Sequence, residues 1–157
     1  MRIGLFAVLA ALLLGPVGAA KAIADDGLIT KSSAHSGQAT LTRLEASLKK
    51  RGFMIFARLD HSAAAKSKGL TMPFSTVLVF GNPKLGTPQF VLRPKLAIDL
   101  PLKMLVWDDK SGKTWLTYNT PTYVLGTLYP RHGAPTNQKL LKRVTKGFDV
   151  ITSEAVK

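Results

Sequence analysis

The stretch from residue 75 to residue 88 limits the possible folds of this chain most strongly, because an apolar run is followed there by a stop signal and then by a helix-start signal. Residues 77–80 are β-branched, leucine or aromatic, which is typical of a strand buried on both faces. The Gly-Asn-Pro sequence at residues 81–83 ends that run. Thr87 is a good helix N-cap and Pro88 suits the first helical position. The stretch therefore predicts a strand, a tight turn and a helix.

A helix that begins at this turn would have unpaired backbone N–H groups and a partial positive charge at its start. Lys84 lies beside that start, and Asn82 lies in the turn. One interpretation is a small anion site, in which Asn82 and Lys84 donate hydrogen bonds. The other interpretation is a capped helix that enters a core, and we favour it because most capped helices bind nothing.

The composition narrows the chemistry further. The sequence has no cysteine, which excludes disulfides, thiolate metal sites and a cysteine nucleophile. A hydrophobic content of 46% in 157 residues indicates one folded domain with a real core. The formal net charge of +13 indicates an anionic partner or surface, or serves solubility alone.

The first residues have the pattern of a secretory signal peptide. Arg2 gives a positive start, residues 3–14 form a short apolar run, and small residues follow. The run is shorter than the roughly 20 apolar residues that a membrane span needs, although an uncleaved anchor is the alternative. We expect a signal peptide over residues 1–22, with cleavage after Ala22 or else after Ala24. The expected mature protein is periplasmic, without a membrane span and without a nucleic-acid partner.

The remaining residues, 23–157, show no internal repeat and no linker, so we expect a single domain. Strands are expected at residues 27–32, 53–59, 77–80, 102–107 and 114–119. Helices are expected at 38–51, at 87–92, from a Thr120-Pro121 start through 123–128, and from Pro135-Thr136 onward. Residues 96–101 are expected to be a connecting segment, and Pro130 is expected to end the third helix. This order predicts an α+β fold, with a mixed or antiparallel sheet and helices packed on one face.

Five stretches resemble the family of bacterial proteins called domain of unknown function 302 (DUF 302), in the order and spacing that the family shows. They are residues 27–29, 56–61, 79–84 with 86–88, 99–102 with 106–108, and 115–119. The resemblance spans about residues 27–133 and implies a compact fold similar to one repeat of the TATA-box-binding protein. That likeness is architectural and does not imply DNA binding.

The resemblance implies no reaction, because the family is named for lacking an established one. It does imply self-association, so a homodimer is expected. The chain departs from the family pattern at residues 126–130, which look like an insertion before Arg131 and His132. The tail from Pro135 is also unusually basic. No role is therefore carried over to His132.

Three residues are candidates for acid–base catalysis, and these are His61, Asp99 and Asp108. His61 follows a strand and adjoins an aspartate, and a histidine titrates near neutral pH. It would bind an anion or a metal, move a proton, or only cap a backbone carbonyl. Asp108 is expected to serve its hairpin turn. Asp99 is expected to cap a backbone N–H group or to pair with Lys103.

The candidate ligand-binding residues are His61, Asn82, Lys84 and Tyr118. Tyr118 could line an apolar pocket with Trp107 and Trp115, but hairpin residues of this kind more often belong to a core or a dimer surface. The basic segment at residues 139–146 could contact anionic lipid, but burial of its leucine face is the favoured interpretation.

No cofactor is indicated, since the sequence has neither a Walker nor a dinucleotide glycine pattern. No metal site is expected, because the three histidines are far apart in sequence. A hydrolase is disfavoured by the lack of a Gly-x-Ser-x-Gly elbow. We therefore expect a non-enzymatic domain that binds a small ligand or anion. An enzyme that uses His61 as acid or base, and a basic protein-interaction module, are the alternatives.

Overall fold

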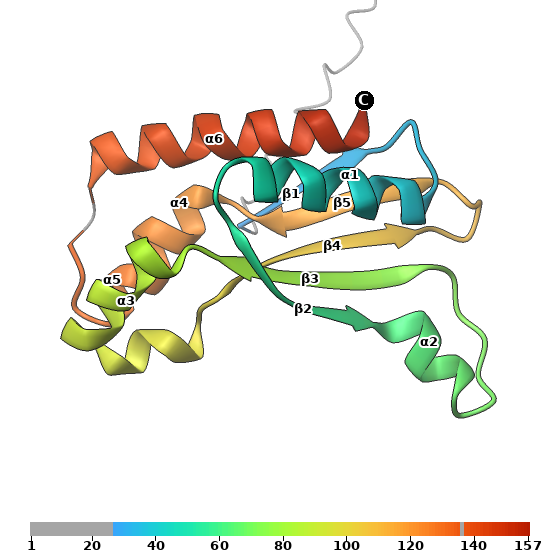
Figure 1. Cartoon of the computed structure of the whole chain (residues 1–157), viewed down its shortest axis with the longest axis horizontal. Helices are drawn as coiled ribbons and strands as arrows, with labels where there is room; N and C mark the ends of the chain where they lie inside the picture. Colours follow the sequence, from blue (N-terminus) through green and yellow to red (C-terminus); the bar gives the residue numbers. More distant parts are fainter. Residues whose placement is uncertain (1–26, 136) are drawn as a thin grey trace, which may run out of the picture.

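The computed structural model describes residues 27–135 and 137–157 as a five-stranded sheet with helices (Figure 1). The strands are β1 (Leu28–Ser32), β2 (Met54–Asp60), β3 (Ser75–Gly81), β4 (Leu102–Asp108) and β5 (Thr114–Asn119). Their order is β1-β5-β4-β3-β2, and every pair is antiparallel. The expected α+β fold is thus confirmed. The expected signal peptide and Thr136 lie outside the described residues.

The two longest helices, α1 (Gly37–Lys50) and α6 (Gln138–Val156), cover the same face of the sheet (Figure 1). The short helix α2 (His61–Lys66) follows β2 at one end of the sheet. The opposite end carries α3 (Pro83–Leu92), the 3-10 segment η1 (Pro94–Ile98) and α5 (Tyr129–Arg131). Between β5 and α5 the chain forms α4 (Pro121–Tyr123) and a π-helical turn, η2 (Val124–Leu128).

The core lies between the sheet and the pair α1 and α6. Alternate residues of the three central strands point to this side, since successive strand side chains face opposite ways. These residues are Leu78, Phe80, Met104, Val106, Leu116 and Tyr118, and all are buried. Leu44 and Leu48 of α1 and Ile151 of α6 meet them, so one apolar cluster joins all three elements.

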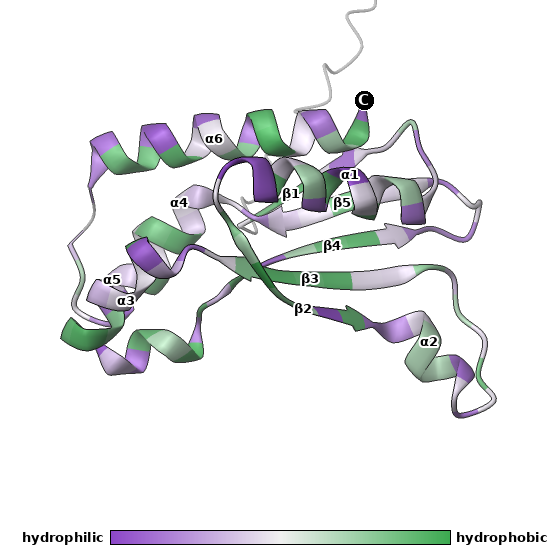
Figure 2. Cartoon of the chain, viewed as in Figure 1, coloured by the Kyte–Doolittle hydropathy of each residue, from purple (hydrophilic) through white to green (hydrophobic). Residues whose placement is uncertain are grey.

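The other side of the sheet has no helix of the described residues packed along it, and we call it the open face (Figures 1 and 2). Its large apolar residues on β2 to β5 are Met54, Phe56, Leu59, Val77, Val79, Leu105, Trp107 and Trp115. Met54, Phe56 and Leu59 are 52%, 47% and 49% exposed. Trp107 and Trp115 stack across the hairpin at 6.3 Å. Both tryptophans point away from Tyr118, which lies on the helix side of the sheet, so the apolar pocket that these three residues could line together does not form.

A bulge in β2 lies at the same face. The register between β2 and β3 shifts between Ile55 and Ala57. Phe56 covers Gly81 there, and a Cβ atom at Gly81 would lie 2.9 Å from the Phe56 ring. Gly81 is therefore needed for the aromatic ring to close over the end of β3.

The start of α3 differs from the prediction. The helix begins at Pro83 and its N-cap is Asn82, whose Oδ1 accepts a hydrogen bond from the Lys84 backbone N–H at 3.0 Å. Thr87 and Pro88 lie inside the helix instead of starting it. The reason is that both Asn-Pro and Thr-Pro are start signals, and the first one adjoins the end of β3.

Three other expectations about the helices are corrected. Residues 96–98, the first part of the segment 96–101 expected as connecting chain, belong to η1. Pro130 does not end its helix, because the π-helical turn before it carries the chain on through Arg131. The last helix begins at Gln138, where the Asn137 side chain caps the Leu140 N–H at 2.9 Å. It continues through Gly147 to Val156.

Candidate ligand-binding site

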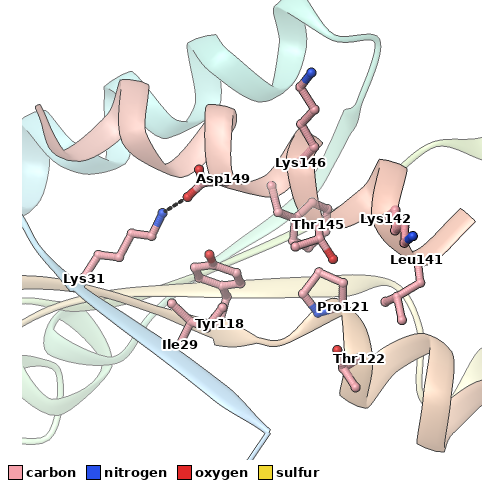
Figure 3. Close-up of a pocket in the computed structure, with 11 residues that line it drawn as sticks. Ile29, Lys31, Tyr118, Pro121, Thr122, Leu141, Lys142, Thr145, Lys146 and Asp149 are labelled. Carbon is pink, nitrogen blue, oxygen red and sulfur yellow. Dashed lines mark hydrogen bonds and ion pairs between the residues drawn. The ribbon is translucent and has the colours of Figure 1, made fainter. Parts of the chain in front are cut away.

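A pocket of about 510 Å³ lies where the β1–β5 edge of the sheet meets α6 and the start of α4 (Figure 3). The residues that line it are Ile29, Lys31, Tyr118, Pro121, Thr122, Leu141, Lys142, Thr145, Lys146, Phe148 and Asp149. They come from four elements, β1, β5, α4 and α6, that are widely separated in the sequence. The pocket is therefore a product of tertiary packing.

The floor of the pocket is apolar. Ile29 and Tyr118 are direct cross-strand partners on the helix side of the sheet. Tyr118 is 4% exposed, and its ring lies edge-on to Phe148 of α6 with 6.0 Å between the centroids. Figure 3 shows its hydroxyl pointing toward α6. Tyr118 also belongs to the core cluster, which is one of the positions favoured for it from the sequence.

One basic side chain of the pocket is already paired. Lys31 Nζ donates to Asp149 Oδ1 at 2.6 Å and to Thr152 Oγ1 at 2.9 Å (Figure 3). The hydrogen bond from Lys31, with its positive charge, holds the pKa of Asp149 below its ordinary value. Asp149 therefore stays ionised and neutralises Lys31, so this pair fixes the strand to the helix and adds no net charge.

Two further basic side chains give the pocket its charge. Lys142 and Lys146 lie four residues apart on α6, which places them on one side of the helix. Neither forms an ion pair with any residue that the structure describes. The hydroxyls of Thr122 and Thr145 add hydrogen-bonding groups to the lining. The pocket therefore combines an apolar floor with a basic rim.

His61 lies far from the other predicted ligand-binding residues. It is exposed in the first turn of α2, directly after β2, and Asp60 caps that helix through the Ala63 N–H at 2.8 Å. Asn82 and Lys84 follow β3, whose last residue pairs with the first residue of β2. The length of a seven-residue strand, about 20 Å, therefore separates them from His61. A single site shared by His61, Asn82 and Lys84 does not form in this fold.

Asn82 and Lys84 lie at the start of α3. The side-chain oxygen of Asn82, Oδ1, caps α3 by accepting a hydrogen bond from the Lys84 N–H, as described above. Lys84 is exposed in the first turn of α3. The favoured interpretation of this helix start, a cap without a ligand, agrees with both placements, although α3 does not enter the core because none of its residues is buried.

Asp99 has a different partner from the two that the sequence predicts. Its Oδ2 lies 2.5 Å from Nε2 of His132, and its oxygens lie 3.5 Å from the Arg131 guanidinium. The His132 hydrogen bond holds the pKa of Asp99 below its ordinary value, with Arg131 assisting. An ionised carboxylate only accepts hydrogen bonds, so the histidine ring donates. This cluster fastens α5 to the end of η1, and Lys103 contributes only a minor attraction.

Asp108 serves the β4–β5 hairpin, as predicted. It accepts a hydrogen bond from Thr114 Oγ1 at 2.6 Å. Its neighbour Asp109 accepts from Ser111 and from the Trp115 indole at 2.8 Å, which lowers the pKa of Asp109 to about 2. Asp99 and Asp108 stand at opposite ends of β4. The constellation of His61, Asp99 and Asp108 therefore does not come together as one acid–base site.

Within residues 27–135 and 137–157, no group of three or more histidine, cysteine, aspartate or glutamate side chains is placed to hold a metal ion. In the same residues, no helix is both long enough and apolar enough to cross a membrane.

The sequence did not single out Lys31, Lys142 or Lys146 as site residues. Lys31 is a lone cation in a short strand, and nothing local links it to α6. The two lysines of α6 carry a weak signal, their i,i+4 spacing beside a leucine stripe, but solvated lysines show the same pattern. Only the packing of α6 on β1 and β5 sets them around a common space.

Comparisons with known proteins identify the family. The sequence model described as "Domain of unknown function DUF302" matches residues 29–151. In fold, the chain is similar to the crystal structure of an uncharacterised conserved DUF302 protein from Bacillus stearothermophilus. The TM-score is 0.67 at 20% identity, over 83% of this chain and 98% of that chain.

The chain is also similar to longer curated proteins. It is 37% identical over 134 residues to proteins named fluoride-specific ion channel FluC 1 from Brucella suis biovar 1 (strain 1330) and from Brucella abortus biovar 1 (strain 9-941). The match covers 85% of this chain, but 51% and 48% of those proteins. The chain thus spans about half the length of the curated relatives it matches.

Proposed function

The chain belongs to the DUF302 family, and from that premise we propose that it is a periplasmic, non-enzymatic domain that binds a small amphiphilic anion in the pocket beneath α6. The observation that carries the proposal is the pairing of an apolar floor, Tyr118 and Phe148, with a basic rim, Lys142 and Lys146. An apolar body would fill the floor while its acid group meets the lysines. The periplasmic location is supported by the signal-peptide pattern of residues 1–22.

The size and lining of the pocket narrow the ligand class. A volume of about 510 Å³ falls within the range of small-molecule sites. Fluoride, the ion in the names of the relatives, is a poor match, because a small and strongly hydrated anion needs several converging donors to replace its water. An organic acid with an apolar chain or ring gains from burial and from charge together.

Titration calorimetry with octanoate tests this proposal, with the uncharged octanamide as the matched probe. We expect octanoate to bind, octanamide to bind more weakly, and added salt to reduce the difference. Thr145→Leu fills the space beneath α6 at an exposed helical position and should weaken octanoate binding at least about tenfold. Lys142→Gln should reduce the preference for the acid over the amide.

Lys139→Gln is the control for these variants, because Lys139 is an exposed lysine of the same helix outside the pocket lining. It should leave both titrations unchanged. Equal affinity for octanoate and octanamide would contradict an anion site. Binding that survives Thr145→Leu at full strength would place the ligand elsewhere.

We also infer that the chain forms a homodimer through the open face. The support is the apolar character of this surface and its low charge, since Lys103 is the one charged residue that β3, β4 and β5 direct to that side within the described chain. A second copy is the occupant that such a face fits, because its own open face is equally apolar.

The enzymatic alternative is less favoured, because its three candidate catalytic residues, His61, Asp99 and Asp108, do not lie in one site. A paired aspartate and histidine, such as Asp99 and His132, can relay a proton. Here Asp99 also contacts Arg131, and the pair joins α5 to the end of η1, which is a structural role. We therefore propose ligand binding as the function.

A further inference from the structure

The end of the molecule that carries α3 and η1 exposes several large apolar side chains. Leu85, Val91, Leu92 and Ile98 are 65%, 75%, 69% and 76% exposed. Figure 2 shows the apolar colour on α3 at this projecting end. We call these four side chains the tip patch. Single exposed leucines are ordinary on a protein surface, but four on adjoining elements indicate a contact surface.

Helix α3 buries little surface against the rest of the domain. None of its ten residues is buried. The segment is held in place instead by η1, whose Leu96 is fully buried, and by the Asn82 cap. A helix of this composition usually hides one side against its own protein. The apolar side chains of α3 are therefore displayed on a supported element.

Apolar and basic side chains lie next to one another on α3, although the helix is not strongly amphipathic. Leu85 and Leu92 lie seven residues apart and so project from nearly the same side, and Lys84 and Val91 repeat that spacing beside them. Lys95 follows on η1, close to Ile98. Long basic side chains next to apolar ones can reach headgroups while their neighbours enter the acyl boundary.

The charge around the tip patch is almost entirely positive. Between Pro83 and Trp107 the basic residues are Lys84, Arg93, Lys95 and Lys103, and the one acid is Asp99. Asp99 is already engaged by His132 and Arg131, so it does not offset the lysines at the tip. Two copies that met through this surface would bring the same lysines together, and like charges oppose that contact.

We propose that the tip patch, with Lys84, Arg93 and Lys95, is a docking surface for an anionic lipid bilayer. The four apolar side chains insert at the level of the headgroups, and the basic side chains bind lipid phosphates. The surface lies at the α3 end of the sheet, away from the pocket beneath α6, so this inference does not depend on the proposed ligand.

Co-sedimentation of the full chain with vesicles tests the proposal. The probes are vesicles of phosphatidylglycerol with phosphatidylethanolamine, compared with vesicles of phosphatidylcholine alone. We expect binding to the anionic vesicles only, and a decrease with added salt. Leu85→Ser with Leu92→Ser should weaken binding about tenfold per side chain. Lys84→Gln with Lys95→Gln should weaken it about fivefold per lysine.

Matched controls separate the tip from the rest of this basic protein. Val150→Ser changes an exposed apolar residue of α6, and Lys66→Gln with Lys68→Gln removes two exposed lysines near α2, at the other end of the sheet. Both controls should bind vesicles like the unchanged chain. All these side chains are exposed, so circular dichroism should show every variant folded.

Three outcomes would overturn the proposal. The first is a lack of binding to anionic vesicles. The second is binding that the tip variants leave unchanged while Lys139→Gln with Arg143→Gln on α6 abolishes it, which would place the lipid contact on α6. The third is a change of oligomeric state in Leu85→Ser with Leu92→Ser without any change in vesicle binding, which would make the tip an interface between copies.

Discussion

Glu154 ties the two covering helices together at a single carboxylate. Its Oε2 accepts hydrogen bonds from Ser47 at 2.7 Å and from Arg51 at 2.8 Å, and its Oε1 accepts a second bond from Arg51 at 2.6 Å. A bidentate guanidinium contact of this kind has fixed geometry. The backbone carbonyl of the same residue accepts from Arg43 at 2.9 Å. Residues of α1 thus hold the last turns of α6 from two sides.

This contact predicts part of the acid sensitivity of the fold. The Arg51 and Ser47 hydrogen bonds lower the pKa of Glu154 from 4.5 to about 2. The unfolded chain then takes up this proton at a higher pH than the folded chain does. The stability that Glu154 contributes is fully present above about pH 4.5 and is lost as the pH falls through about 2.

Urea unfolding across this pH window checks the prediction. The free energy of unfolding should fall less steeply for Glu154→Gln than for the unchanged chain, because glutamine does not titrate. Parallel slopes for the two proteins would show that the Arg51 contact contributes nothing in solution.

At the scale of the element, α6 contains a glycine that the fold does not use. Gly147 lies within the helix, and a Cβ atom built there meets no atom within 4 Å. Gly147→Ala should therefore raise the free energy of unfolding by roughly 0.5–1 kcal/mol, from helix propensity alone. Thermal unfolding of the two proteins measures this difference. A loss of stability would mean that α6 bends or packs at Gly147 in a way the structure does not show.

The elements that the sequence predicted well are those defined by local signals. The strand at residues 114–119 agrees to the residue, because a polar turn ends before it and Gly112 supplies the positive φ of 81° that this turn needs. The start of α3 was missed because two adjacent start signals compete, and tertiary packing decides between them. A sheet with helices on one face was predicted from the order of the elements, but the strand order was not, because no local signal specifies which strands pair.

The candidate site, in contrast to these elements, was poorly predicted from local signals. Tyr118 was considered for a pocket shared with Trp107 and Trp115, but it lines a different pocket on the other side of the sheet. Its partners Lys31 and Lys142 come from β1 and α6, and no local pattern records that they meet. His61, Asn82 and Lys84 carried the strongest local signals, yet the antiparallel pairing of β2 and β3 separates them. Local chemistry identifies candidate groups, but topology decides which of them share a site.

At the scale of the whole molecule, the open face sets the expected assembly. Strands of up to 7 residues, about 3.3 Å per residue and about 4.8 Å apart, give the face an extent of roughly 20 Å in each direction. A flat area of that extent, roughly 400 Å², is about half of the roughly 800 Å² per partner of a standard interface, so the proposed dimer would be a small one unless flanking segments join it. Leu59, half-exposed opposite Val77, lies within the open face.

Leu59→Lys should convert the proposed dimer to a monomer. The substitution puts a charge at a desolvated contact on both copies, which should raise the dissociation constant at least about a hundredfold. Native mass spectrometry and light scattering report the state directly. Val150→Lys, at a similarly exposed apolar position on α6, is the control and should leave the dimer intact. A monomeric unchanged chain would remove the proposal altogether.

The proposed ligand binding and the proposed dimer formation take place on opposite sides of the sheet. The pocket is reached from the α6 side, whereas the open face lies on the opposite side, and no residue belongs to both. The two sites share strand β5 but no side chain, so we expect the coupling free energy between ligand binding and assembly to be near zero. The affinity for octanoate should then be the same at every protein concentration, and empty and loaded subunits should mix at random within one population of dimers.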